Sequence, residues 1–288
     1  MTLPLHNQRF DLSLVGVLLQ CLDSEQKPLP GVFASGFVRK ESEGHFLYTC
    51  WHVVTGFDPN DVRVGFALPK RQYLQVSLQA SDKSHPGVER IGGIQTFILP
   101  LYEVIEDSRR PLWHQDDAHI PHPDLNAIGL YVPFWHDVVK LRLPDDMAVS
   151  DDQPIDEERI FRGNMPIITP GDKCIVVGYP YGYSAFGPGQ PTPVALTRFI
   201  ASNRIGGRVQ QFLLDGIAAP GMSGGPVYIE RDDNLLLLGI YTGSIYPDAG
   251  RCQRDRATDL GTVSDLSLLL RNRLKMVKTP SEPHTRGA

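Results

Sequence analysis

Short runs of apolar and β-branched residues alternate with polar turns along most of the chain. Runs of about 4–8 such residues, bounded by Gly, Pro, Asn, Asp or Ser, are typical of β-strands. Residues 31–39 and 45–54 form a predicted hairpin around the polar turn 40–44. The other expected strands are 12–21, 62–67, 73–78, 95–101 and 127–132, and then 173–178, 194–201, 209–214, 225–230, 235–241 and 257–263.

So many short strands with frequent turns predict an all-β protein built as a sandwich or barrel. Between the two series of strands lies an acidic connecting segment, residues 143–164, with seven Asp and Glu but no Lys or Arg up to position 158. Such a run indicates a solvated connection between two β domains. Four leucines at helical spacing predict a C-terminal helix over 264–277. The polar residues 278–288 are expected to form a disordered tail.

Composition narrows the function classes. Of the 288 residues, 41% are hydrophobic and 21% charged, which allows a substantial core and excludes wholesale disorder. The net charge is −5 and no run of Lys or Arg occurs, so neither nucleic acid nor an anionic membrane is an expected partner. No apolar run reaches the ~18 residues of a membrane span, and residues 1–10 do not resemble a signal peptide. Four scattered cysteines predict free thiols in a reducing compartment, and a cytoplasmic location is expected.

A glycine-flanked serine is the sharpest local signal. Residues 220–226 read Pro-Gly-Met-Ser-Gly-Gly-Pro, which predicts a tight turn with backbone N–H groups left unshielded. If Ser223 is a nucleophile, the N–H groups of Gly221 and Ser223 can form one hole that holds an oxyanion. Taken alone, the segment also fits a glycine-rich β-turn without catalytic meaning.

A histidine that follows the strand-like run 46–48 is the second signal. His52 lies in the segment Thr-Cys-Trp-His-Val-Val, residues 49–54. A lone histidine at such a place is usually a surface or core residue. Its pairing with Ser223 favours catalysis, because a serine hydroxyl becomes a good nucleophile only when a base removes its proton, and histidine suits that role.

Together, residues 49–52 and 221–226 resemble the histidine and serine segments of the trypsin-like (chymotrypsin-fold) serine proteases, in particular the bacterial forms without disulfides. Residues 34–38 look like the strand that opens the first barrel of that family. Residues 177–180 and 239–240 resemble strands of its second barrel.

The resemblance implies two six-stranded Greek-key barrels, over residues 1–142 and 165–263, with the active site between them. It implies an intracellular serine endopeptidase that acts on polypeptides through an acyl-enzyme and needs no cofactor. In that scheme Ser223 attacks the scissile carbonyl, and His52 is the general base.

The third catalytic position has two candidate registers in residues 122–132. If Asp124 is the acid, Asn126 falls where the family buries a small or apolar side chain, and a buried amide is costly unless it is hydrogen-bonded. If Asn126 takes the acid's position, the apolar positions that follow fit better. An asparagine can orient the imidazole but cannot stabilise the imidazolium ion that forms during the reaction. Both registers stay open.

By resemblance, the base of the primary substrate pocket lies near Ile217, and its wall runs through Tyr241, Thr242, Gly243 and Ser244. No Asp stands at the base, so a preference for Lys or Arg is not expected. A small or medium apolar side chain is the expected substrate residue.

The sequence also raises the questions of a metal site and of a function other than catalysis. His and Asp residues gather between positions 114 and 124, but prolines break the segment, and we interpret it as a solvated loop rather than a metal site. A non-catalytic binding module on a trypsin-like fold is the alternative function, because fold does not fix function. The ambiguous acid is its main support.

Overall fold

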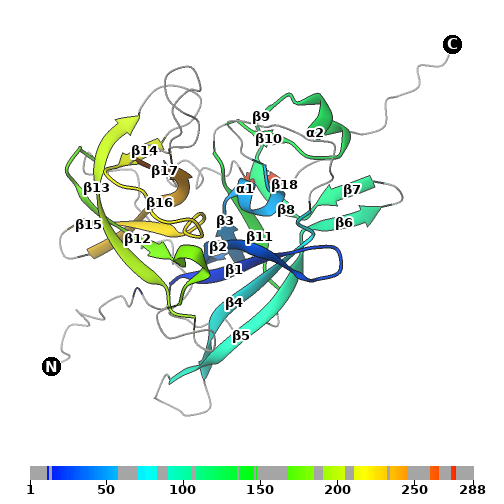
Figure 1. The fold of residues 1–288 in the computed structure, drawn as a ribbon, viewed down its shortest axis with the longest axis horizontal. Coiled ribbons are helices and arrows are strands. Elements are labelled where there is room, and N and C mark those ends of the chain that lie inside the picture. The colour runs from blue at the N-terminus through cyan, green and yellow to red at the C-terminus, as the bar shows by residue number, and fades with distance from the viewer. Residues whose placement is uncertain are drawn as a thin grey trace.

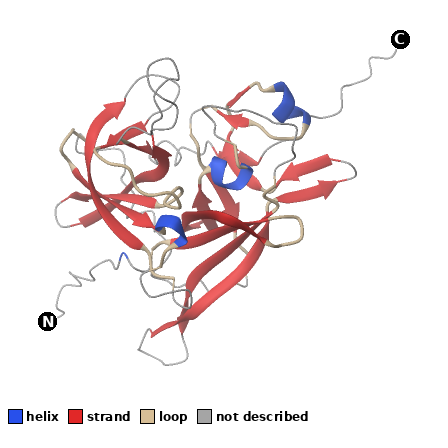
Figure 2. Cartoon of the chain, viewed as in Figure 1, coloured by secondary structure: helices blue, strands red, loops and turns tan. Residues whose placement is uncertain are grey.

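The structure is a computed structural model. It describes residues 12, 15–57, 70–82, 90–105, 108–134, 136–145, 147, 168–184, 191–204, 211–231, 234–244, 260–265 and 274–276. Strands dominate these residues and the helices are short (Figure 2), so the prediction of an all-β protein is confirmed. Two β units lie side by side in Figure 1, one formed by the N-terminal half of the chain and one by the C-terminal half.

The first unit is built on an eight-stranded sheet with the strand order β18-β8-β11-β3-β2-β1-β4-β5. Its long β4–β5 hairpin extends away from the body of the molecule (Figure 1). In chain order the strands are β1 (Val17–Leu22), β2 (Pro28–Glu41), β3 (Gly44–Thr49), β4 (Tyr73–Asp82), β5 (Arg90–Pro100), β8 (Trp113–Asp116), β11 (Val139–Arg142) and β18 (Leu274–Met276). The smaller elements are α1 (Trp51–Thr55), β6 (Tyr102–Ile105), β7 (Ser108–Pro111), β9 (His119–Ile120), α2 (Pro123–Ala127) and β10 (Val132–Pro133).

The second unit is a closed barrel of six strands in the order β12-β13-β14-β17-β16-β15. A six-stranded barrel in this part of the chain was predicted, and that prediction is confirmed. The elements are β12 (Lys173–Gly178), the 3₁₀ turn η3 (Pro180–Gly182), β13 (Val194–Arg204), β14 (Gln211–Leu214), β15 (Pro226–Arg231), β16 (Asn234–Ser244) and β17 (Gly261–Asp265).

Several predictions about the fold are wrong or concern residues outside the described part of the chain. The first unit does not close into a barrel among the described strands, because β5 and β18 are outer strands that each pair on one side only. The strand expected over 62–67 and the tail 278–288 lie outside the described residues, as does most of the acidic segment 143–164.

A single helix over 264–277 does not form. Its first two positions end β17, which pairs with β14 and β16, and residues 274–276 form β18 at the edge of the first sheet. Strand pairing therefore replaces the expected helix at both described ends of this range. Residues 266–273 lie outside the described part.

The strand expected over 127–132 is also replaced. Pro123 stands in the first turn of α2, and the His122 side chain accepts a 3.4 Å hydrogen bond from the Leu125 N–H at the N-cap. Gly129, with φ of 77°, follows in the left-handed region. These local capping signals start and end a short helix, and only Val132 joins a strand.

The buried apolar residues form two clusters: one fills the first unit and extends to Val177, Tyr228, Leu237 and Ile240 of the barrel, and the other lies within the second unit. Trp51 and Trp113 are fully buried in the first unit, where they pack among the inward faces of the strands. Cys21, Cys50 and Cys174 are buried and free, which confirms the expectation of free thiols for these three residues. Among the described residues, no helix is long and apolar enough to cross a membrane.

Ser35 on β2 joins the two units. This fully buried residue donates its N–H to the Ser223 carbonyl oxygen (2.9 Å) and its hydroxyl to the Gly221 carbonyl oxygen (2.7 Å). The Ser35 hydroxyl also accepts the Tyr179 N–H at 2.9 Å. One side chain of the first unit thus holds two parts of the second unit: the loop that carries Ser223 (residues 219–225, here called the serine loop) and the end of β12.

Gly224 marks how closely the units approach. A Cβ atom there would lie 2.1 Å from the Ser35 carbonyl oxygen and 2.3 Å from the Thr49 hydroxyl. Its φ is 89°, which also disfavours any side chain. The serine loop can therefore sit against β2 and β3 only with glycine at this position.

We predict that Gly224→Ala loses about 4 kcal/mol of unfolding free energy or more, because left-handed strain and overpacking add. Gly31→Ala is the matched control, since Gly31 has φ of 70° but nothing within 4 Å of its added Cβ. That variant should lose about 1–2 kcal/mol from strain alone. Urea denaturation of both variants measures the difference. Equal losses would contradict the close approach of the two units.

Candidate active site

His52 lies on the one-turn helix α1, directly after β3. The helix ends at Gly56, which has a left-handed backbone and donates its N–H to the His52 carbonyl oxygen at 2.9 Å. Trp51, Val53 and Val54 on the same helix are buried and fix it to the first core. The His52 side chain lies outside this core. It keeps 26% of its surface exposed and stays accessible to a reactant.

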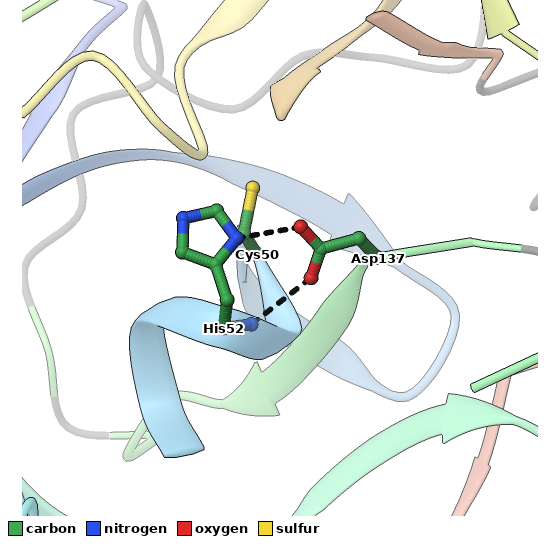
Figure 3. A group of neighbouring side chains, drawn as sticks. All are labelled: Cys50, His52 and Asp137. Atoms are coloured by element: carbon green, nitrogen blue, oxygen red, sulfur yellow. Dashed lines mark hydrogen bonds and ion pairs between the residues drawn. The ribbon is translucent and has the colours of Figure 1, made fainter. Parts of the chain in front are cut away.

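Asp137 holds His52 at two points (Figure 3). Its Oδ2 lies 2.5 Å from Nδ1 of the imidazole, and its Oδ1 accepts the His52 backbone N–H at 2.9 Å. A carboxylate at Nδ1 requires a proton on that nitrogen, so the neutral ring carries its lone pair on Nε2. Nε2 points away from Asp137 in Figure 3. The pair is therefore built as an oriented base backed by a buried carboxylate.

Sheet register places Asp137 at the histidine. β11 pairs with β3 so that Val139 faces Thr49, which puts the residue two before Val139 beside the start of α1. The Asp137 side chain is only 9% exposed. His52 thus follows the end of β3, and Asp137 precedes the start of β11. Two paired strands are a rigid support for a functional pair.

Arg71 supports α1 from its C-terminal end. Its Nη1 donates to the carbonyl oxygens of His52 (2.7 Å) and Val53 (2.6 Å), which also accept the Gly56 N–H and the Cys21 thiol, respectively. The positive charge also suits the negative end of the helix dipole. Arg71 therefore fixes the backbone that carries the imidazole.

The serine loop, residues 219–225, presents two N–H groups beside its serine that bond no protein acceptor in the described part of the chain. The N–H groups of Met222 and Gly225 close turns within it, and that of Gly224 donates to the Tyr241 carbonyl oxygen at 2.8 Å. The N–H groups of Gly221 and Ser223 donate no hydrogen bond to the protein among the described residues. Partly buried N–H groups are rarely left unpaired without a reason. A pair of them beside a serine hydroxyl can receive an anionic oxygen.

Close packing with η3 fixes the start of the serine loop. Gly221 has φ of 92°, and a Cβ there would lie 2.5 Å from the Tyr179 carbonyl oxygen. Met222 is fully buried, whereas Ser223 is half-buried. The loop thus anchors the residue before the serine and leaves the serine open to solvent.

Cys50 and Tyr241 link the histidine segment to the serine loop. The Cys50 thiol donates to the Tyr241 carbonyl oxygen at 3.4 Å, and that oxygen also accepts the Gly224 N–H. Cys50 stands two residues before His52, and Gly224 follows Ser223. No hydrogen bond joins Ser223 to His52 in the part of the chain that the structure describes. The two residues belong to segments that share direct contacts through Cys50 and Tyr241.

Donor atoms of Cys50, His52 and Asp137 all lie within 4.8 Å of one another. The geometry fits a hydrogen-bonded pair better than a metal centre. Nδ1 and Oδ2 are 2.5 Å apart, whereas two ligands about 2.1 Å from a tetrahedral ion are separated by ~3.4 Å. Burial, and next the nearby Asp137 charge, raise the pKa of the Cys50 thiol well above its usual range, so this thiol stays protonated.

The two predicted acid candidates do not contact His52. Asp124 and Asn126 lie on α2, and neither shares a hydrogen bond or ion pair with His52 among the described residues, since Asp137 occupies Nδ1. The sequence offered a signal for Asp137, because it directly precedes the apolar run that forms β11. We expected no strand over 139–142, so this carboxylate was missed.

Of the expected pocket residues, Tyr241 packs directly against the serine loop. The Tyr241 ring is fully buried, and its hydroxyl accepts the Ala218 N–H (2.9 Å) and donates to the Ala218 carbonyl oxygen (3.1 Å). Ile217, which directly precedes Ala218, is 37% exposed. Thr242 is hydrogen-bonded to Thr262. The Tyr241 side chain therefore fills the space between β16 and the chain leading to Ser223.

Comparison with known proteins gives no family for this chain. It matches no protein family, and no curated protein is similar to it at a significant level.

Proposed function

We propose that the protein is a serine endopeptidase with Ser223 as nucleophile, His52 as general base and Asp137 as the acid that orients His52. The observation that carries the proposal is the double contact between Asp137 and His52, which presents Nε2 as the base. The unpaired N–H groups of Gly221 and Ser223 support it as an oxyanion hole.

The reaction follows from these roles. Nε2 of His52 takes the Ser223 proton as Oγ attacks the carbonyl carbon of the substrate, and the two N–H groups stabilise the resulting oxyanion. The imidazolium ion, stabilised by Asp137, then gives its proton to the leaving amine as the peptide bond breaks. Water, deprotonated by His52, releases the acyl group from Ser223 by the same steps in reverse order.

The alternative of a non-catalytic binding module was supported mainly by a doubtful acid. The contact of Asp137 with His52 favours the enzyme over this alternative, because a catalytic histidine needs a carboxylate on Nδ1 and a binding surface does not. The free thiols of Cys21, Cys50 and Cys174 favour action in a reducing compartment such as the cytoplasm.

Ser223 should be the residue modified by a fluorophosphonate probe, which captures an activated serine as a covalent adduct. We expect the wild type to be labelled and Ser223→Ala to show no labelling, as judged by in-gel fluorescence. Ser202→Ala, which changes a half-buried serine on β13, is the matched control and should label like the wild type. Labelling of a folded Ser223→Ala variant would exclude this nucleophile.

Asp137→Asn should reduce turnover of an ester or peptide substrate by roughly 10⁴-fold, because an amide at Nδ1 permits the wrong tautomer and cannot stabilise the imidazolium ion. Asp124→Asn and Asn126→Ala, on α2, should change turnover less than about threefold. Steady-state kinetics on one substrate compare all three. A large loss in Asp124→Asn with a mild effect in Asp137→Asn would assign the acid to α2 instead.

We further propose that Tyr241 limits the substrate residue before the scissile bond to a small side chain. Tyr241→Leu should raise kcat/KM for a Phe substrate relative to the matched Ala substrate at least tenfold, as one or two methylene-sized spaces are worth about 1–3 kcal/mol. Tyr241→Phe keeps the ring and should retain the wild-type preference. Unchanged selectivity in a folded Tyr241→Leu variant would show that the ring does not border the pocket.

A further inference from the structure

We infer that Tyr181 and Tyr183, here called the tyrosine platform, bind the unfolded polypeptide substrate next to Ser223. The inference rests on the proposed function and adds a surface that recognises the chain beyond the scissile bond. Three independent features support it: exposure of both rings, backbone strain at Tyr181, and direct contact of the underlying backbone with the serine loop.

The rings of the platform are unusually exposed. Tyr181 is 71% exposed and Tyr183 is 60% exposed, and no other tyrosine among the described residues is exposed. Tyrosine side chains offer a large, rigid and amphipathic contact area at low entropic cost, which makes them frequent in binding surfaces. Rings that cover no core contribute little to folding and are free to contact a bound chain.

Backbone strain at Tyr181 also supports a binding role for the platform. Its φ and ψ are 53° and 25°, in the left-handed region that non-glycine residues adopt at a cost of about 1–2 kcal/mol. A 2.6 Å hydrogen bond from its N–H to the Pro220 carbonyl oxygen holds this conformation. The next residue, Gly182, packs against the ring of Phe33. Strain of this kind is retained mainly where function requires it.

The platform stands directly on the serine loop. A Cβ atom on Gly221 would lie 2.8 Å from the Tyr181 backbone nitrogen and 3.3 Å from that of Gly182. Gly221 is two residues before Ser223 and supplies one of the two unpaired N–H groups. A chain whose peptide bond lies at Ser223 therefore passes the platform within its next few residues.

An unfolded chain fits the platform better than a folded partner. The two exposed rings carry no charge, so their contact with a bound chain is largely apolar and tolerant of sequence. A segment that occupies it must continue from the bond held at Ser223, which requires an extended and locally unfolded chain.

The test compares two probes, fluorescein-labelled casein as an unfolded polypeptide and p-nitrophenyl butyrate as an ester too small to reach the platform. The measured quantity is the ratio of kcat/KM for casein to kcat/KM for the ester. In the double variant Tyr181→Ala, Tyr183→Ala this ratio should fall about tenfold, mainly through KM for casein. Phe199→Ala, which removes another exposed aromatic ring on β13, should leave the ratio unchanged.

Tyr181→Gly separates binding from a structural role. Glycine adopts the left-handed backbone without strain, so this variant should be at least as stable as the wild type in urea while its casein-to-ester ratio still falls. Tyr181→Phe should keep the wild-type ratio.

Unchanged ratios in the Tyr181→Ala, Tyr183→Ala double variant and in Tyr181→Gly would overturn the platform. So would a wild type that hydrolyses the ester but not casein. A wild type inert to both probes and to a fluorophosphonate would instead refute the proposed function, and the platform with it.

Discussion

The arrangement of the candidate site depends on the contact between Ser35 and the serine loop. A fully buried hydroxyl and N–H of one β unit bind two carbonyl oxygens of the other, on either side of Met222. With the loop carbonyls fixed in this way, the N–H groups of Gly221 and Ser223 donate to no acceptor among the described residues. Gly224 makes the approach possible, because any side chain there would collide with Ser35 and Thr49.

Much of the fold could be predicted because its signals are local. Alternating apolar runs identified the strands of the second barrel, and the glycines around Ser223 indicated a tight, crowded turn before any geometry was known. His52 was found in the same way, from a histidine that directly follows a strand. The structure confirms the all-β class and the closed barrel, whereas the catalytic roles of these residues remain proposals.

The residues that the sequence did not reveal depend on long-range pairing. Asp137 and His52 are 85 residues apart in the sequence. They meet only because β11 pairs with β3 in one register. The two ends of the expected C-terminal helix depart from the prediction for a related reason, since residues 264–265 and 274–276 pair with strands distant in sequence. At Pro123 the opposite occurred, and a local cap produced a helix where alternation predicted a strand.

The pairing of β18 with β8 has a consequence for synthesis. Lys275 on β18 forms an ion pair with Asp117, at a separation of 158 residues, so the first sheet contains a strand translated long after the rest of it. Domains generally fold as they leave the ribosome, N-terminal part first. Here the N-terminal unit cannot complete its edge until residues 274–276 emerge. The nascent chain therefore carries His52 and Asp137 in an unfinished sheet until the serine loop and the second barrel have already been made.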